Sequence, residues 1–307
     1  MINVAFVQIH YPVTMGRYMW EALLRREDVQ VWSTGPYSAN WIPWKRGMQL
    51  PPSYVREPDV PLPMGDYPTV MYSNLTQFLP DDFKPDLWLE TNGGLRTIGR
   101  PKGLYAVVGT DPHVLNDEFY GPARIEADYF FCMQTPYMRE GDIWLPYAHD
   151  PIWHARTPIP WEERRYDVSL MGLMYNNRQQ FFKRAKERGF AVLADTGKAY
   201  EDARSIYHET RVGFNWSSMD DTTARVFELM AMGLPSLFNV TTDLENMFKV
   251  DEQFLGFQGV EMALEKLQWL IDNPDEAEAI ADRAWEAVQE HTWDARVETI
   301  LKETGLL

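Results

Sequence analysis

The sequence predicts an α/β protein built from two Rossmann-like, doubly wound domains. Two observations support this fold class. Apolar, strand-like runs alternate with helix-like stretches in both halves of the 307-residue chain, and the pattern starts again after a proline-rich segment at residues 146–160. The length is sufficient for two domains, each with its own core. We therefore expect an N-terminal domain over residues 1–150 and a C-terminal domain over residues 151–307, with a ligand cleft between them.

The N-terminal half opens with a predicted strand over residues 2–9, a helix over 15–26 and a second strand over 29–33. Further strands are predicted at 86–90, 104–109, 127–133 and 142–145. Residues 35–66 have no clear period, are rich in Pro, Trp and Tyr, and are interpreted as a long insertion. Trp41 and Trp44 in this insertion either stack on a sugar or base, or pack the loop onto the domain.

The C-terminal half repeats the alternation and ends in helices. Strands are predicted at 167–173, 190–194, 212–216, 234–240 and 250–257, and helices at 177–188, 200–209 and, with a break at Asn273-Pro274, over 260–304.

The segment Thr222–Pro235 lies between two of these strands and completes a βαβ unit, which predicts a parallel sheet. Phe227, Met230 and Ala231 share one helical stripe, which we expect to face the sheet. Arg225 and Glu228 form a second stripe near the helix N-terminus, where an Arg suits phosphate and a Glu accepts hydrogen bonds from ribose hydroxyls. Gly233 is the expected C-terminal stop of the helix.

Composition limits the class of protein. The formal net charge of −16 argues against nonspecific binding of polyphosphate but leaves room for a local basic site. The single cysteine, Cys132, excludes an intrachain disulfide and is expected in a buried strand. The six histidines show no metal-ligand spacing, and no apolar run approaches the roughly 20 residues that cross a bilayer. From the spacing of the histidines we expect no metal site, and we expect no cofactor. With no basic leader before the first strand, we expect a cytoplasmic protein without membrane insertion.

Four segments, in order, resemble motifs of GT-B glycosyltransferases of the group 1-like type, and especially of spore-maturation (CgeB-like) proteins. Arg225–Gly233 resembles the R-x-F-E-x-M-A-x-G motif of this family, and Leu145–Asp150 resembles its interdomain L-P-x-A-x-D motif. The other two are Asp167–Gly172, followed by Asn177-Arg178, and His291–Arg296. The resemblance covers about the C-terminal half and implies the GT-B fold, with C-terminal helices packing back toward the N-terminal domain.

The resemblance also implies a function. A nucleotide-sugar would bind mainly to the C-terminal domain, with the acceptor on the N-terminal side, and transfer would be metal-independent and retaining. Glu228 would bind ribose, Arg225 the diphosphate, and Arg178 would be a second phosphate ligand beside the Gly172 loop. The sugar-contact position falls on Asp220, beside Asp221 and Thr222. Each assignment has a plain alternative: an i,i+3 ion pair for Arg225 and Glu228, a solvated helix start for Arg178, and helix capping for Asp220 and Asp221.

Two further sites belong to the N-terminal domain. Asp111 and His113 follow a predicted strand, so His113 would contact the transferred sugar or acceptor, with Asp111 orienting it or acting as base; a turn-forming Asp-Pro is the alternative. Gly16 stands at the start of the first helix, as a site of close ligand approach or as an ordinary turn glycine. His149, in the interdomain segment, could approach the same cleft, and His10, at the end of the first strand, is a weaker candidate.

The sequence thus favours a glycosyltransferase that uses a nucleotide-sugar donor. The acceptor stays open: a protein, a glycan, a small molecule or a modified nucleic-acid base. Two alternatives remain, a noncatalytic nucleotide- or carbohydrate-binding protein on a degenerate GT-B scaffold, and a nucleotide-sugar epimerase.

Overall fold

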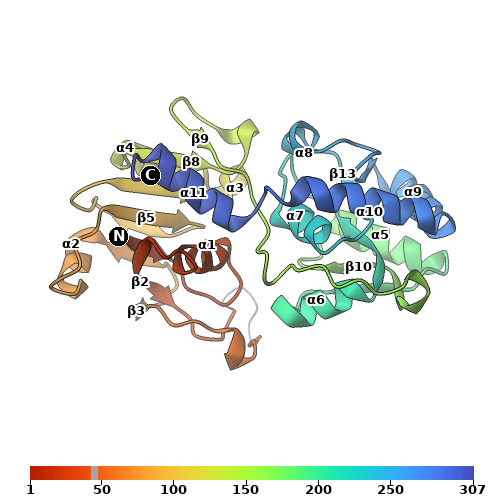
Figure 1. The fold of residues 1–307 in the computed structure, drawn as a ribbon, viewed down its shortest axis with the longest axis horizontal. Helices are drawn as coiled ribbons and strands as arrows, with labels where there is room; N and C mark the ends of the chain where they lie inside the picture. The colour runs from red at the N-terminus through yellow and green to blue at the C-terminus, as the bar shows by residue number, and fades with distance from the viewer. Residues whose placement is uncertain (43–47) are drawn as a thin grey trace. The chain divides into compact units, whose positions relative to one another are not determined.

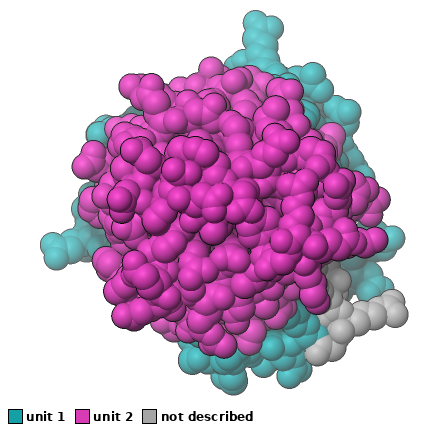
Figure 2. Space-filling view, turned by 90° about the vertical axis from the view of Figure 1, so that its right-hand side faces the viewer, with its two compact units in different colours: residues 1–146, 293–307 teal, residues 147–292 magenta. Residues whose placement is uncertain are grey.

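The computed structural model describes residues 1–42 and 48–307, which form two compact units. Unit 1 contains Met1–Pro146 and Trp293–Leu307, and unit 2 contains Tyr147–Thr292 (teal and magenta in Figure 2). The chain passes from unit 1 to unit 2 within the proline-rich segment. Residues 293–307, which the division at residue 150 assigns to the C-terminal domain, group with unit 1.

Unit 1 is built on a seven-stranded sheet in the order β3-β2-β1-β5-β7-β8-β9 (Figure 1). Every pairing in this sheet is parallel. The strands are β1 (Ile2–Gln8), β2 (Val29–Tyr37), β3 (Val60–Pro63), β5 (Leu87–Asn92), β7 (Tyr105–Gly109), β8 (Tyr129–Cys132) and β9 (Ile143–Trp144). β1 and β5 are buried along almost their whole length, as apolar runs in a parallel sheet require.

The α-helices of unit 1 are α1 (Met15–Leu24), α2 (Tyr72–Leu75), α3 (Pro112–Leu115), α4 (Tyr120–Glu126) and α11 (Trp293–Glu303). Short 3₁₀ turns lie at Pro52–Tyr54, Thr76–Phe78 and Thr135–Tyr137. The C-terminal helix α11 packs on α1 through a stacked Tyr18–Trp293 ring pair, with centroids 6.5 Å apart. Arg25 on α1 donates two hydrogen bonds, of 2.9 and 2.7 Å, to the Asp294 carboxylate. These contacts join the last helix of the chain to its first.

The interpretation of residues 35–66 as a patternless insertion was wrong in part. β2 runs on to Tyr37, and β3 pairs with it in parallel register from Thr34 opposite Val60 to Tyr37 opposite Pro63. The two prolines of β3 hid it, but an edge strand tolerates them because one side of its backbone needs no partner. Two further short strands that the sequence did not indicate, β4 (Thr69–Met71) and β6 (Arg96–Ile98), pair with each other. Trp41 is 38% exposed, and Trp44 lies outside the described residues.

Unit 2 is the second doubly wound unit, with a five-stranded parallel sheet in the order β11-β10-β12-β13-β14. Its strands are β10 (Tyr166–Met171), β11 (Val192–Asp195), β12 (Thr210–Asn215), β13 (Ser236–Asn239) and β14 (Leu255–Phe257). Its helices are α5 (Asn176–Glu187), α6 (Tyr200–His208), α7 (Ala224–Ala231), α8 (Thr242–Met247), α9 (Val260–Asp272) and α10 (Pro274–Val288), with a 3₁₀ turn at Trp161–Glu163. The predicted break falls between α9 and α10, where Pro274 starts the new helix.

Helix α7 confirms the βαβ prediction but not the predicted facing of its side chains. β12 precedes α7 in the chain and β13 follows it, and the two strands pair in parallel. Gly233 ends the helix with a φ of 72°. The residue that packs on β12 is Leu229, whose side chain lies 3.0 Å from where a Cβ on Gly213 would be. Phe227 instead contacts the rings of Phe248 and His291. The stripe prediction is wrong for Phe227, because α7 is buried on nearly all sides and a single face therefore carries little information.

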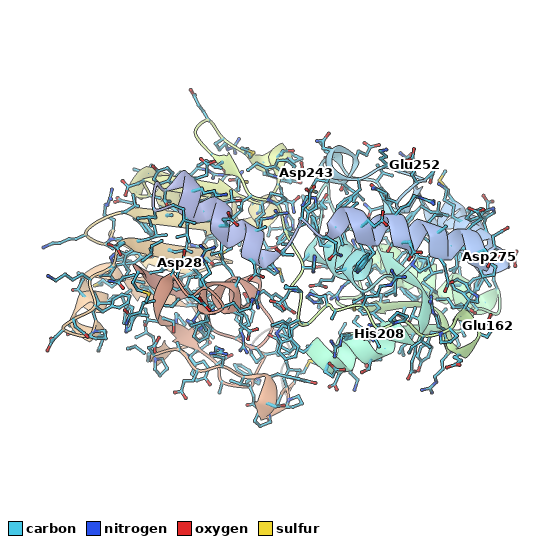
Figure 3. The ribbon with its side chains drawn as sticks, viewed as in Figure 1. Asp28, Glu162, His208, Asp243, Glu252 and Asp275 are labelled. Atoms are coloured by element: carbon cyan, nitrogen blue, oxygen red, sulfur yellow. The ribbon has the colours of Figure 1, made fainter. Side chains whose placement is uncertain are left out.

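Cys132 is fully buried in β8, as expected. None of the helices in the described ranges 1–42 and 48–307 is long and apolar enough to cross a membrane. The acidic charge is spread over exposed positions of both units, including Asp28 in unit 1 and Glu162, Glu252 and Asp275 in unit 2 (Figure 3).

Candidate active site

The strand order of unit 2 sets its candidate ligand site. The chain runs from β10 outward to β11 and then returns to the other side of β10 as β12. In open α/β sheets, such a switch point leaves a crevice at the carboxyl ends of the two central strands. α5 follows β10 and α7 follows β12, so the first turns of both helices belong to this edge. A helix N-terminus offers unpaired backbone N–H groups and a positive dipole end, which suit an anion.

Arg225 and Glu228 form a pair at the start of α7. Arg225 Nη1 lies 2.7 Å from Glu228 Oε2, and the side chains are 26% and 7% exposed, respectively. The pair is therefore not a solvated surface ion pair, because one member is almost completely buried. The Arg225 side chain stays partly exposed, so a ligand can reach it.

His154 stands on the other side of the Glu228 carboxylate, and the sequence did not indicate it. Its Nδ1 accepts a hydrogen bond of 2.9 Å from the Asp150 backbone N–H, so the proton of the neutral ring is on Nε2. Nε2 faces Glu228 Oε1 at 3.7 Å. Burial lowers the pKa of His154, with Glu228 opposing this effect. The one available signal was its position four residues after Asp150 of the interdomain motif.

Arg178, in the first turn of α5, is held by acceptors of the protein. Its Nε donates to Trp216 O at 2.7 Å, Nη1 to Leu173 O at 2.7 Å, and Nη2 to Asn215 Oδ1 at 3.0 Å. The residue is 6% exposed. Burial lowers its pKa, and the charge of Arg225 lowers it further. Arg178 thus ties the loop after β10 to the end of β12, and two cations act on each other at this edge.

Tyr207, on α6, contacts both the end of β10 and Arg225 at the start of α7. Its hydroxyl accepts a hydrogen bond of 2.8 Å from the backbone N–H of Met171, the residue before Gly172. The Arg225 guanidinium lies 5.5 Å from the centroid of the Tyr207 ring. Gly172 itself donates its N–H to Asp195 O at 2.8 Å. Tyr207 was predicted only as part of a helix, since the role of its hydroxyl depends on strand neighbours.

Residues 220–222, just before the N-cap residue of α7, connect the loop in front of α7 to the start of α8. Asp220 accepts hydrogen bonds from the N–H and the hydroxyl of Thr242, at 2.8 and 2.6 Å, and so caps α8 rather than α7. Asp221 is buried and accepts from the Met219 N–H at 3.2 Å. Thr222 shares a 2.6 Å hydrogen bond with Thr241.

The N-cap position of α7 is Thr223, whose extended backbone is usual for an N-cap. Its Oγ1 is buried and has no hydrogen-bond partner in the described part of the chain. Buried hydroxyls normally have partners. This one stands at the helix end where we expect an anion.

In unit 1, Asp111 and His113 lie at the carboxyl end of β7. Asp111 is the N-cap residue of α3; its N–H donates to the Tyr120 hydroxyl at 3.3 Å, and its carboxylate accepts from Thr110 at 3.2 Å. His113 is the second residue of α3, and its Nδ1 is buried without a partner among the residues described. Its ring centroid lies 6.1 Å from that of Tyr137.

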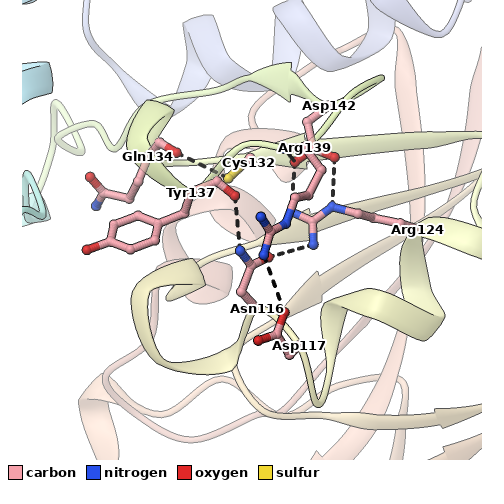
Figure 4. Close-up of polar contacts among 8 residues, drawn as sticks. All are labelled: Asn116, Asp117, Arg124, Cys132, Gln134, Tyr137, Arg139 and Asp142. Carbon is pink, nitrogen blue, oxygen red and sulfur yellow. Dashed lines mark hydrogen bonds and ion pairs between the residues drawn. The ribbon is translucent and has the colours of Figure 1, made fainter.

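A polar network holds the loop that carries Tyr137 (Figure 4). Arg124 donates two hydrogen bonds to Asp142, of 2.8 and 2.7 Å, and a third of 2.6 Å to Asn116 Oδ1. The Asn116 amide donates in turn to the Tyr137 carbonyl at 3.1 Å. This network ties α4 to the segment that carries Tyr137, whose ring is the neighbour of His113.

Gly16 is explained by packing. A Cβ on Gly16 would lie 1.8 Å from Gln8 Oε1, so the Gln8 amide occupies the space that a larger residue would need. The orientation of Gln8 follows from His10, whose Nε2 faces Thr34 O at 3.1 Å and must carry the proton. His10 Nδ1 therefore accepts from Gln8 Nε2 at 3.1 Å, and Oε1 turns toward Gly16. Close approach at Gly16 is by the protein itself, and burial lowers the pKa of His10 to about 3.

Across residues 1–42 and 48–307, no group of three or more His, Cys, Asp or Glu side chains is arranged to hold a metal ion. Two guanidiniums, two helix N-termini and a buried carboxylate lie at the carboxyl edge of the unit 2 sheet. Such a set of groups suits an anion next to a hydroxylated group.

Residues 162–302 match the sequence profile of a family described as glycosyl transferase-like. No curated protein sequence matches the chain. The matched segment covers most of unit 2 and reaches into α11, so the similarity to this family lies in the C-terminal half of the chain.

Solved structures match the whole chain. An α-glucosyltransferase in complex with UDP and a 13-mer DNA has a TM-score of 0.68 at 10% identity, over 99% of this chain and 100% of that one. HepE of Anabaena in complex with UDP and glucose has a TM-score of 0.66 at 11% identity, over 100% of both chains. The sucrose-phosphate synthase of Thermosynechococcus elongatus has a TM-score of 0.62 at 11% identity, over 100% and 99%. The chain has the two-unit GT-B fold of these glycosyltransferases, as the sequence predicted. The CgeB-like subfamily stays a prediction.

Proposed function

We propose that this protein is a glycosyltransferase that transfers a sugar from a nucleotide-sugar donor to an acceptor, without a metal ion. The nucleoside diphosphate binds at the carboxyl edge of the unit 2 sheet, against the first turn of α7. The match of residues 162–302 and the GT-B fold support the reaction class, and the side chains of unit 2 support the site.

The observation that carries the proposal is the Arg225–Glu228 pair. A glutamate side chain that is only 7% exposed lies at the switch-point edge beside an arginine side chain that is still 26% exposed. Burying a carboxylate is costly, and structural needs alone are met as well by an apolar residue. A ribose hydroxyl pair and a phosphate are the ligand groups that use both side chains at once.

The chemistry follows from where charge develops. As the bond between the sugar and the diphosphate breaks, negative charge grows on the leaving phosphate. Arg225, the N–H groups of the first turn of α7 and the Thr223 hydroxyl are placed to stabilise that charge. Arg178 contributes at longer range, since its guanidinium is occupied by three acceptors. In a retaining reaction the leaving phosphate can take the acceptor proton, so no protein nucleophile is needed.

We propose UDP as the first nucleoside diphosphate to test, because UDP or UDP-glucose is bound in several structures of the same fold. In unit 1, Asp111 and His113 are the groups we assign to the transferred sugar or the acceptor. The acceptor class is open, and one solved neighbour is bound to DNA. Use of a nucleotide sugar fits an enzyme that acts in the cytoplasm.

Calorimetric titration with UDP, GDP, ADP and dTDP tests the donor site, and donor hydrolysis or transfer with the corresponding sugar nucleotides tests the reaction in the presence of EDTA. We expect binding of at least one diphosphate and turnover that survives chelation. Neither binding nor turnover with any donor would overturn the proposal.

One observation favours a second function, a noncatalytic nucleotide-binding protein. Both carboxylate oxygens of Asp220, at the expected sugar-contact position, are engaged by Thr242. A pure binder would retain diphosphate affinity and show no hydrolysis or transfer with any sugar nucleotide. An epimerase would instead convert the donor without an acceptor, which product analysis detects.

A further inference from the structure

The turn after β5 lies at the switch point of the unit 1 sheet. The chain runs from β1 outward to β2 and β3 and then returns to the other side of β1 as β5. Asn92 is the last residue of β5, and it stands opposite Gly109, the last residue of β7. The turn that begins at Asn92 therefore lies beside the loop that carries Asp111 and His113, at the edge where open α/β sheets bind ligands. The proposed function uses no residue of this turn.

Asn92 is fully buried, and its side chain closes the turn. Its Oδ1 accepts hydrogen bonds from the N–H groups of Gly94 and Leu95, at 3.0 and 3.1 Å. Its Nδ2 donates to Leu95 O at 2.9 Å and to Glu90 Oε1 at 2.7 Å. The amide thus uses both of its N–H donors and accepts two hydrogen bonds, so its orientation is fixed.

Glu90 holds the Asn92 amide from the core of unit 1. The residue is fully buried, and its Oε2 accepts hydrogen bonds from the hydroxyls of Tyr72 and Tyr105, at 2.7 and 2.6 Å. Burial raises the pKa of Glu90, and its three hydrogen-bond donors oppose this effect. Because burying a carboxylate is costly, the contact with the Asn92 amide is the feature that an apolar residue at this position could not supply.

The backbone carbonyl of Asn92 connects the turn to the Asp111 loop. It accepts hydrogen bonds from the Thr110 N–H at 3.1 Å and from the Tyr120 hydroxyl at 2.6 Å. The Tyr120 hydroxyl accepts in turn from the Asp111 N–H at 3.3 Å. The Thr110 hydroxyl lies 3.2 Å from both Asn92 O and Asp111 Oδ2. A displacement of Asn92 therefore reaches both the backbone and the carboxylate of Asp111.

Gly93 brings the turn directly against the same loop. A Cβ on Gly93 would lie 3.0 Å from Thr110 Oγ1 and 3.9 Å from Asp111 Oδ2. The turn thus forms one side of the space around the Asp111 carboxylate, and its position decides how open that space is.

We propose that Asn92 is a positioning residue for Asp111. Held by Glu90, Asn92 fixes the turn over residues 93–95, and its carbonyl, with the Tyr120 hydroxyl, fixes the loop that carries the Asp111 carboxylate. The role of Asp111 toward the transferred sugar or the acceptor rests on the proposed function. The reaction then depends on an amide that is buried away from both ligands.

The variant Asn92→Ala tests the proposal in the full chain. It removes the acceptor of the Gly94 and Leu95 N–H groups and the tie to Glu90. We expect turnover of a sugar nucleotide, by hydrolysis or transfer, to fall at least about tenfold, as for other residues that orient a ligand-contacting group. UDP affinity belongs to unit 2 and should stay within about twofold. Amide hydrogen exchange, read by NMR, should become faster at Leu95 and Asp111.

Tyr120→Phe and Tyr72→Phe form a matched pair. Both rings are fully buried, and each variant loses one hydroxyl that donates within unit 1. Tyr120→Phe breaks the link between Asn92 O and the Asp111 N–H, so it should lower turnover and speed exchange at Asp111, even if Asn92→Ala does not fold. Tyr72→Phe removes a donor from Glu90 Oε2 and leaves the Asn92 contact on Oε1. It should lower the melting temperature while turnover and exchange at Asp111 stay unchanged.

Equal losses of turnover in Tyr120→Phe and Tyr72→Phe would overturn the proposal, because turnover would then follow the stability of the core alone. Unchanged exchange at Asp111 in Asn92→Ala and Tyr120→Phe would also overturn it.

The exchange measurement separates this proposal from the proposed function. If the unchanged protein binds no diphosphate and turns over no donor, the proposed function fails, and exchange at Asp111 still decides whether Asn92 positions this residue. If donors are turned over and both Asn92→Ala and Tyr120→Phe match the unchanged protein, the positioning proposal fails alone.

Discussion

The first turns of α5 and α7 carry the same residue type for different purposes. Both helices begin at the switch point of the unit 2 sheet, and each places an arginine there. Arg178 is 6% exposed and gives three hydrogen bonds to acceptors of the protein, whereas the Arg225 side chain is 26% exposed and pairs with Glu228. Because all three hydrogen bonds of Arg178 hold protein loops, we assign the start of α5 to the scaffold and propose that the start of α7 binds the ligand.

The largest effect should come from Arg178→Ala. Its removal leaves Trp216 O, Leu173 O and Asn215 Oδ1 without their donor in a buried place. We expect a loss of about 3–5 kcal/mol in the free energy of unfolding, measured by urea denaturation. Arg178→Lys should lose less, because an ammonium reaches some of these acceptors but not the whole fork. A stable Arg178→Ala protein that has lost only diphosphate binding would reverse the comparison.

Arg225→Ala should act on ligand binding. We expect diphosphate affinity to fall about 100-fold, equal to about 2.8 kcal/mol, from the loss of a charge-assisted contact to phosphate. The single variant also leaves the buried Glu228 carboxylate without its cation, so stability should fall too. The double variant Arg225→Ala/Glu228→Gln removes that charge, and it should regain stability without regaining affinity. Calorimetry and thermal melts of both variants separate the two effects; recovery of affinity in the double variant would contradict the assignment.

The sequence predicted the architecture because periodicity and strand–helix alternation are local. The i,i+3 spacing of Arg225 and Glu228 is local too, so the sequence predicted that they could pair. It could not predict the acceptors of Arg178 or the position of His154, because only the fold brings the Trp216 and Leu173 carbonyls to Arg178 and the His154 ring to the Glu228 carboxylate. β3 was missed because its prolines are allowed only at a sheet edge, and edges depend on strand order.

Tyr207→Phe should give a smaller loss of stability, because it removes only the hydroxyl oxygen that accepts from the Met171 N–H. The Met171 N–H would lose its acceptor, while the aromatic ring under Arg225 stays. We expect a loss of about 1–2 kcal/mol in unfolding free energy and a change in diphosphate affinity of less than about fivefold. A much larger loss of affinity at unchanged stability would show that the α5 side of the edge also contacts the ligand.

The smallest effect is expected for Asp220→Asn, and it decides how far the family's sugar-contact position applies here. In the structure, both oxygens of Asp220 cap α8 through Thr242. Asn also caps helices well, so stability should change by less than about 0.5 kcal/mol, whereas Asp220→Ala should cost about 1 kcal/mol. If Asp220 only caps, donor turnover in Asp220→Asn stays within a few-fold of the unchanged protein. If its carboxylate binds the donor sugar, turnover falls far more than stability does, and the loop before α7 must release Thr242 when the donor binds. Comparing the turnover of Asp220→Asn with its melting temperature therefore assigns Asp220 either to the scaffold with Arg178 or to the ligand with Arg225.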